Sequence, residues 1–161
     1  MCRSGILAWI LVLAACAWAQ AAPAYAPNPK LLRDYAKLEA KAATQTGPKQ
    51  AETLAKLAEL DFTFGHDGLL ANQAAEGQRH LDLAGQNADR AMALLQQEVS
   101  RGKTNDMKNV EVSLQKITYG LKGLAEEVRF TERPKVQALA QHFADLRAQL
   151  LDWMFAPKKK G

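Results

Sequence analysis

The sequence predicts an all-α protein, an antiparallel bundle of about five amphipathic helices that follows a signal peptide. Its composition leans on Ala, Leu, Gln, Glu and Lys, which are good helix formers. After residue 29, proline occurs only at Pro48, Pro134 and Pro157, so residues 49–133 contain no residue of this helix-breaking type. Apolar residues recur every three or four positions, and no long stretch alternates β-branched with polar residues as strands do.

The N-terminal region predicts a signal peptide at residues 1–19 and a flexible tether at residues 20–29. Arg3 is the only charge before Lys30, and residues 5–15 are almost wholly apolar. That stretch is shorter than the roughly 20 apolar residues that cross a bilayer. The tether is rich in Ala and Pro, and its prolines disfavour a helix because they lack a backbone N–H donor.

Two processing routes remain open for this leader. Residues 17–19, with Gln20 behind them, form a small-x-small site for ordinary signal peptidase. Residues 13–16 instead resemble a bacterial lipobox, whose Cys16 would carry lipid and anchor the protein to the outer membrane. Both routes predict an extracytoplasmic protein, periplasmic or secreted, that meets a membrane only through a lipid on Cys16.

Cysteine and charge exclude several classes of function. Cys2 and Cys16 both lie in the leader, so the expected bundle domain, residues 30–156, has no disulfide, thiolate nucleophile or thiolate metal site. A basic tail follows at residues 157–161. The formal net charge is only +4, and no basic stripe is interleaved with aromatics, so we expect no nucleic-acid partner.

The first helix is expected from about Lys30 to Thr44. Gly47 and Pro48 end it and open the next helix near Lys49. The apolar faces of these two helices are expected to comprise Leu31, Tyr35, Leu38 and Ala42, then Leu54, Leu57, Leu60 and Phe64.

The second helix contains a glycine-rich patch at residues 65–68. Gly65 and Gly68 could end the helix, or they could allow close packing within it. We favour continuation to about Ala71, with a turn at residues 71–73.

A third helix is expected at residues 74–100, and residues 102–106 separate it from the fourth. Thr104, Asn105 or Asp106 would cap the restart. The expected inward face of the third helix is Leu81, Ala84, Ala88, Met92, Leu95 and Val99.

The last two helices have the clearest periodicity, alternating spacings of four and three that are typical of bundle packing. Only residues 130–134 separate them, which forces an antiparallel hairpin with Thr131 as a cap and Pro134 in the first turn. The two apolar faces are Val110, Leu114, Ile117, Leu121, Leu124 and Val128, and Leu139, Phe143, Leu146, Leu150 and Trp153.

The C-terminal end, residues 150–155, is the densest apolar cluster after the leader. It could dock on a membrane surface or a partner. We instead expect Leu150 and Trp153 to continue the core, with Met154 and Phe155 capping the end of the bundle, because the periodicity runs directly into Trp153.

The second and third helices resemble one degenerate tetratricopeptide-like helical hairpin. Asp61 stands where that family has a bulky residue and Gly68 where it has an aromatic, and no second copy follows. The rest resembles secreted bacterial helical proteins of unknown function, which implies at most a scaffold or partner-binding role. The residues that carry the hairpin resemblance are Phe64, Gly65, Gly77, Leu81 and Ala84.

Histidines and carboxylates offer a metal-binding alternative. Glu76 and His80 are four residues apart on one helical face, with Asp82 close behind. His66 and Asp67 would lie across the hairpin from them. Bundle di-metal sites, however, pair Glu with a His three residues later, in two copies. We therefore interpret these side chains as solvated surface residues.

A catalytic set cannot be assembled. Ser100 and Ser113 are the only serines after the leader, and the chain has no nucleophile elbow and no phosphate-binding glycine loop. We expect no enzyme, no catalytic or cofactor-binding residues and no cofactor. The sequence predicts a non-catalytic extracytoplasmic interaction or structural protein of the bacterial cell envelope, with an unknown protein partner, and the metal-binding bundle is the alternative.

Overall fold

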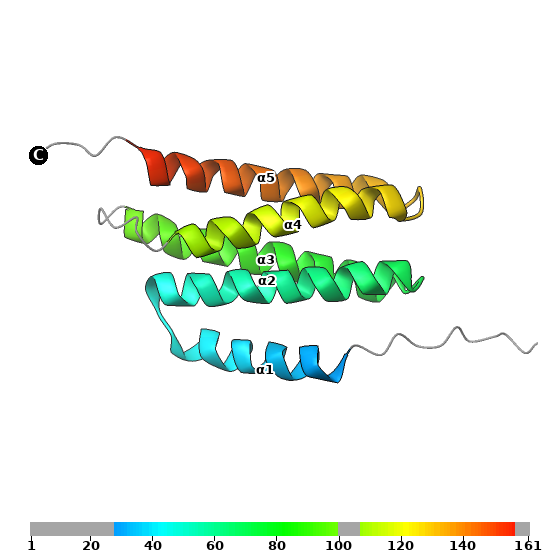
Figure 1. Ribbon diagram of the computed structural model, residues 1–161, viewed down its shortest axis with the longest axis horizontal. Coiled ribbons are helices and arrows are strands. Elements are labelled where there is room, and N and C mark those ends of the chain that lie inside the picture. The colour runs from blue at the N-terminus through cyan, green and yellow to red at the C-terminus, as the bar shows by residue number, and fades with distance from the viewer. Residues whose placement is uncertain (1–27, 100–106, 157–161) are drawn as a thin grey trace, which may run out of the picture.

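The computed structural model describes residues 28–99 and 107–156, and these residues form five α-helices and no strand (Figure 1). The predicted all-α bundle is therefore confirmed. The helices are α1 (Pro29–Thr44), α2 (Gly47–Leu70), α3 (Ala74–Val99), α4 (Lys108–Glu127) and α5 (Arg133–Phe155). The expected leader, the segment around residues 102–106 with its proposed caps, and the tail at 157–161 lie outside the described residues.

Local chemistry explains where α1 and α2 begin. The Asn28 side chain accepts a hydrogen bond from the backbone N–H of Lys30 at 2.9 Å, and Pro29 occupies the first turn, so Pro29 belongs to α1 and not to the tether. Gly47 has a φ of 60°, a conformation that glycine adopts without a steric penalty, and Pro48 follows it in the first turn of α2. The predicted break at this dipeptide is correct.

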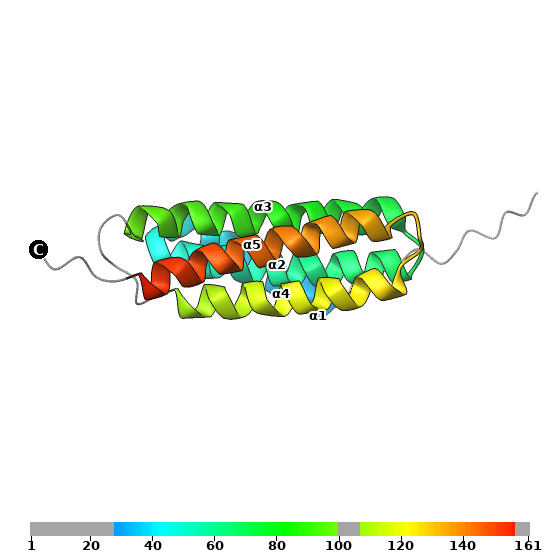
Figure 2. The same cartoon turned by 90° about the horizontal axis from the view of Figure 1, so that it is seen from above.

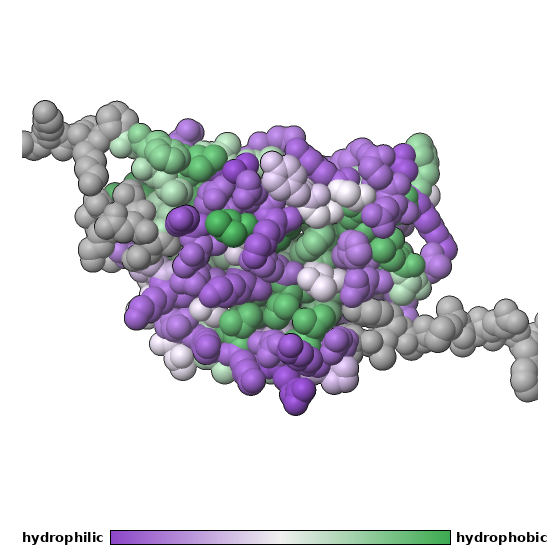
Figure 3. All heavy atoms as spheres, in the orientation of Figure 1, coloured by the Kyte–Doolittle hydropathy of each residue, from purple (hydrophilic) through white to green (hydrophobic). Residues whose placement is uncertain are grey.

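Helices α2 to α5 form two antiparallel hairpins packed side by side. The α2–α3 hairpin contacts the α4–α5 hairpin through α2 against α4 and α3 against α5. Helix α1 lies outside this group and packs on α2 (Figures 1 and 2). Its apolar face is only partly covered, since Leu31, Tyr35 and Leu38 are all half-buried, and an apolar strip runs along the junction of α1 and α2 (Figure 3).

The core contains the apolar faces that the periodicity predicts, except that Leu31 and Leu60 are not part of it. Phe64, Phe143 and Leu150 are each at most 2% exposed. Trp153 and Met154 pack against the core from its edge, as expected for the C-terminal cluster. Phe155 does not cap the bundle, because it is 77% exposed. The fully buried residues of α4 include Val110, Leu114, Ile117, Leu121 and Leu124.

Glycines bring α2 and α3 into backbone contact. A Cβ on Gly68 would lie 2.9 Å from the Cα of Gly77, and one on Gly77 would lie 2.7 Å from the backbone nitrogen of Leu69. The patch at residues 65–68 therefore permits close packing without ending the helix. Helix α2 continues to Leu70, and Asn72 turns the chain with a φ of 62°.

Gly77→Ala should lower the free energy of unfolding by about 1–3 kcal/mol, because the added methyl pushes α2 and α3 apart. Gly123→Ala is the matched control, since a Cβ there meets nothing within 4 Å. It should stabilise the protein by about 0.5–1 kcal/mol through helix propensity. Urea denaturation of both variants measures the difference. Equal effects of the two changes would contradict the close α2–α3 contact.

Two further expectations concern helix ends and membranes. Thr131 is not the N-cap of α5, because Glu132 holds that position and its side chain makes no capping bond. Helix α5 begins one residue later than a Thr131 cap requires, and the Thr131 hydroxyl instead donates to the Glu132 carboxylate at 3.4 Å. Within residues 28–99 and 107–156, no helix is both long enough and apolar enough to span a membrane.

Candidate functional site

A carboxylate lies buried in the middle of α2. Asp61 is 0% exposed and joins three helices. Its Oδ1 lies 3.0 Å from Nδ1 of His80, and its Oδ2 accepts from Nδ2 of Asn87 at 2.9 Å, both on α3. From α1, the hydroxyl of Tyr35 donates to the same Oδ2 at 3.4 Å. We call these four residues the Asp61 network.

Burial sets the electrostatics of this network. It raises the pKa of the Asp61 carboxyl above its ordinary value, and the hydrogen bonds from His80 and Asn87 partly oppose that rise. Burial, followed by the charge of Asp61, raises the pKa of Tyr35 to about 12. The tyrosine therefore stays a hydrogen-bond donor at any physiological pH.

His80 belongs to this network and not to the solvated surface, which corrects the interpretation made from the sequence. Its side chain is only 14% exposed, and its ring lies 5.1 Å from that of Phe64. On the outer side, its Nε2 lies 3.0 Å from Nη2 of Arg79 and 3.4 Å from Oε1 of Glu76. Glu76 and His80 thus meet, as their spacing predicted.

The remaining candidates for metal binding are separate from this pair. His66 lies 3.0 Å from Asp67 with its ring tilted against that of Phe62, while Asp82 accepts from Gln78 at 2.8 Å. The third histidine, His142 on α5, contacts Asp89 of α3 at 2.8 Å. The described part of the chain contains no group of three or more His, Cys, Asp or Glu side chains arranged to hold a metal. The metal alternative rests on Glu76 and His80 alone.

The His80–Asp61 pair resembles the base and orienting group of a catalytic triad, but among the described residues His80 contacts no Ser, Thr or Cys side chain. The outward nitrogen of His80 faces Arg79 and Glu76, both charged side chains. Ser113 is engaged elsewhere, donating to Glu59 between α4 and α2. We assign the Asp61 network a structural role, fixing the positions of α1, α2 and α3.

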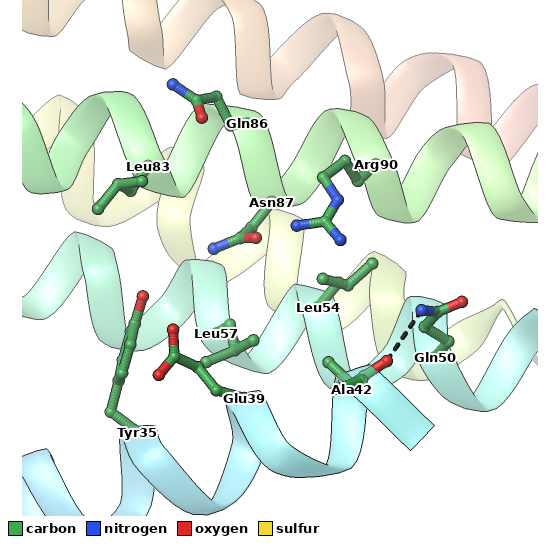
Figure 4. A pocket seen from close by; sticks show the side chains of 11 residues that line it. Tyr35, Glu39, Ala42, Gln50, Leu54, Leu57, Leu83, Gln86, Asn87 and Arg90 are labelled. Carbon is green, nitrogen blue, oxygen red and sulfur yellow. Dashed lines mark hydrogen bonds between the residues drawn. The ribbon is translucent and has the colours of Figure 1, made fainter. Parts of the chain in front are cut away.

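A groove opens next to the network, between α1 and the α2–α3 hairpin, with a volume of about 290 Å³. Leu54 and Leu57 of α2 and Leu83 of α3 form its apolar part (Figure 4). Tyr35 and Asn87 belong to both the groove and the Asp61 network, so the network fixes two of the groove's polar groups. We call this the α1 groove.

Two charged side chains stand on opposite sides of the α1 groove. Glu39 projects from α1 with its carboxylate near Tyr35, and Arg90 hangs from α3 on the other side of Asn87, above Leu54 (Figure 4). Among the described residues, Arg90 makes no hydrogen bond or ion pair, and Glu39 makes no hydrogen bond. Gln50 is already occupied, because its amide donates to the carbonyl of Ala42 at 2.9 Å. The groove therefore offers a free cation, a free anion and an apolar floor.

Two polar residues at inward-facing positions of α2 and α3 are the sequence signal for this site, and the apolar periodicity around them makes that signal easy to miss. Asp61 stands in register with Leu57 and Phe64 on the inward face of α2, where the prediction placed Leu60 instead. Asn87 is one residue from Ala88 on the inward face of α3. A polar residue at an inward position indicates a partner on a neighbouring helix. Which partner it meets depends on how the helices pack.

Comparisons with known proteins leave this geometry as the basis for any functional argument. No protein-family model, no curated protein and no solved structure matches the chain.

Proposed function

We propose that the protein is a non-catalytic extracytoplasmic interaction protein of the bacterial cell envelope, and that it binds its partner in the α1 groove. The observation that carries the proposal is the combination of an apolar floor with unpaired charges at Glu39 and Arg90. Small binding sites usually join apolar lining with a few placed polar groups. The apolar leader with its two processing sites supports an envelope location.

The arrangement of α1 supports the choice of this surface. Helix α1 packs on α2 and buries fully only Ala42. Three hydrogen bonds tie it and the residues after it to α2, including Tyr35 to Asp61 and Gln50 to Ala42. A helix with so few buried contacts opens at a lower free energy than the core helices. Helix α1 is therefore the side of the groove that is held least firmly, while the Asp61 network keeps Tyr35 and Asn87 in place.

Site-specific photocrosslinking in the producing cell tests the proposal. A benzoylphenylalanine at Leu83, which lines the groove, should give one discrete adduct with an envelope protein. The matched control places the same residue at Gln149, which is exposed on α5. It should give no such adduct, because α5 lies away from the groove. The same adduct from both positions, or none from Leu83, would refute this binding surface.

A further inference from the structure

We infer that the α1 groove captures the carboxyl-terminal residue of a partner polypeptide, one with an apolar side chain. This inference rests on the proposed function and names the chemistry of the bound segment. A chain terminus offers three groups together: a carboxylate, a backbone N–H and a side chain. The groove presents a complement to each of them.

Arg90 binds the carboxylate of the chain terminus. Its guanidinium reaches into the groove and, within the part of the chain that the structure describes, pairs with no carboxylate (Figure 4). A guanidinium presents parallel N–H donors that match the two oxygens of a carboxylate. Within a chain only Asp and Glu carry a carboxylate, and neither offers an apolar side chain on the same residue, so Arg90 together with the apolar floor favours a terminal apolar residue.

The side-chain oxygen of Asn87 accepts a hydrogen bond from the backbone N–H of the terminal residue. It is only 8% exposed, and its Nδ2 is committed to Asp61 at 2.9 Å. That bond fixes the amide so that its oxygen lies on the Arg90 side of the groove (Figure 4). A buried carbonyl oxygen held in place is a ready acceptor for an N–H donor. The Asp61 network thus positions this acceptor without touching the ligand.

The floor provides for an apolar side chain, and the volume limits the ligand. Leu54 and Leu57 are at most 3% exposed and close the floor from below, so Leu83 and Ala43 supply its accessible apolar surface, and the groove holds about 290 Å³. Pockets for drug-sized ligands measure roughly 300–1,000 Å³, so this groove lies just below that range. It suits one terminal residue better than a docked helix. Glu39 at the rim disfavours an acidic residue just before the terminus.

Fluorescence anisotropy with synthetic peptides tests the inference. The probes are two fluorescein-labelled hexapeptide pools ending in leucine, one with a free carboxylate and one amidated. The free-acid pool should bind at least about tenfold tighter, as expected when a charge-assisted bidentate pair is lost on amidation. Arg90→Gln should reduce binding of the free-acid pool to the level of the amidated pool.

Arg33→Gln is the matched control, since Arg33 is exposed on α1 and does not line the groove. It removes the same charge and should leave both affinities unchanged, and circular dichroism checks that both variants are folded. Equal binding of the two pools, or no binding at millimolar concentration, would overturn the inference. So would free leucine competing as well as the peptide, which would identify an amino-acid site. None of these results would abolish the crosslink from Leu83. The crosslinking experiment therefore tests the proposed function independently of the peptide experiment.

Discussion

Replacing Phe143 by Ala is expected to lower the free energy of unfolding by about 3–5 kcal/mol, because large-to-small changes in a core lose transfer energy and leave a cavity. Phe143 is 0% exposed on the inward face of α5, which packs against α4 and α3. Urea denaturation of the protein measures the loss. The effect should appear as a lower midpoint with an unchanged slope.

Lys122→Ala is the control for this change. Lys122 is exposed on α4, and its ammonium lies 6.0 Å from the ring centre of Tyr119, so little is lost with it. We expect a change within about 0.5 kcal/mol, as for other surface substitutions. If Phe143→Ala proved as harmless as Lys122→Ala, the pairing of α4 and α5 through their apolar faces would be wrong.

Asp61→Ala should also cost about 3–5 kcal/mol, since removing one partner of a buried polar pair leaves the others unsatisfied. The change removes the acceptor of three side chains, and Asn87 has little access to water in its place. Urea denaturation at neutral pH measures the effect. A loss below about 1 kcal/mol would show that the Asp61 network does not hold the helices together.

Asp61→Asn separates the charge from the hydrogen bonds. The amide keeps the shape, and Asn87 can rotate its own amide to match the new donor. Burial raises the pKa of Asp61 above its ordinary value of 3.8, so the native state holds this proton more tightly than the unfolded state. The resulting stability is present below the ordinary pKa and is lost as the pH rises through the raised one. The Asn variant should not lose stability as the pH rises through this range. Urea denaturation of both proteins at a series of acidic pH values measures the difference.

The sequence alone specified the helices, because each depends on local chemistry. Gly47 and Pro48 separate α1 from α2, and the apolar spacing of α4 and α5 together with their short connection requires an antiparallel hairpin. Helix α2 was correctly extended through the glycine patch, since two glycines alone do not outweigh a continuing apolar face. These features depend on neighbours within a few residues along the chain.

Tertiary structure alone decided the site. Asp61 and Asn87 are 26 residues apart, and Tyr35 is 26 residues from Asp61 in the other direction, so no local pattern links them. Helical periodicity shows which residues face inward, but not which residues of other helices they meet. The separation of α2 and α3 depends on Gly68 and Gly77 lying opposite each other, and that register brings His80 and Asn87 to Asp61. The α1 groove exists because α1 covers only part of that surface, which is a property of packing between helices and not of any one of them.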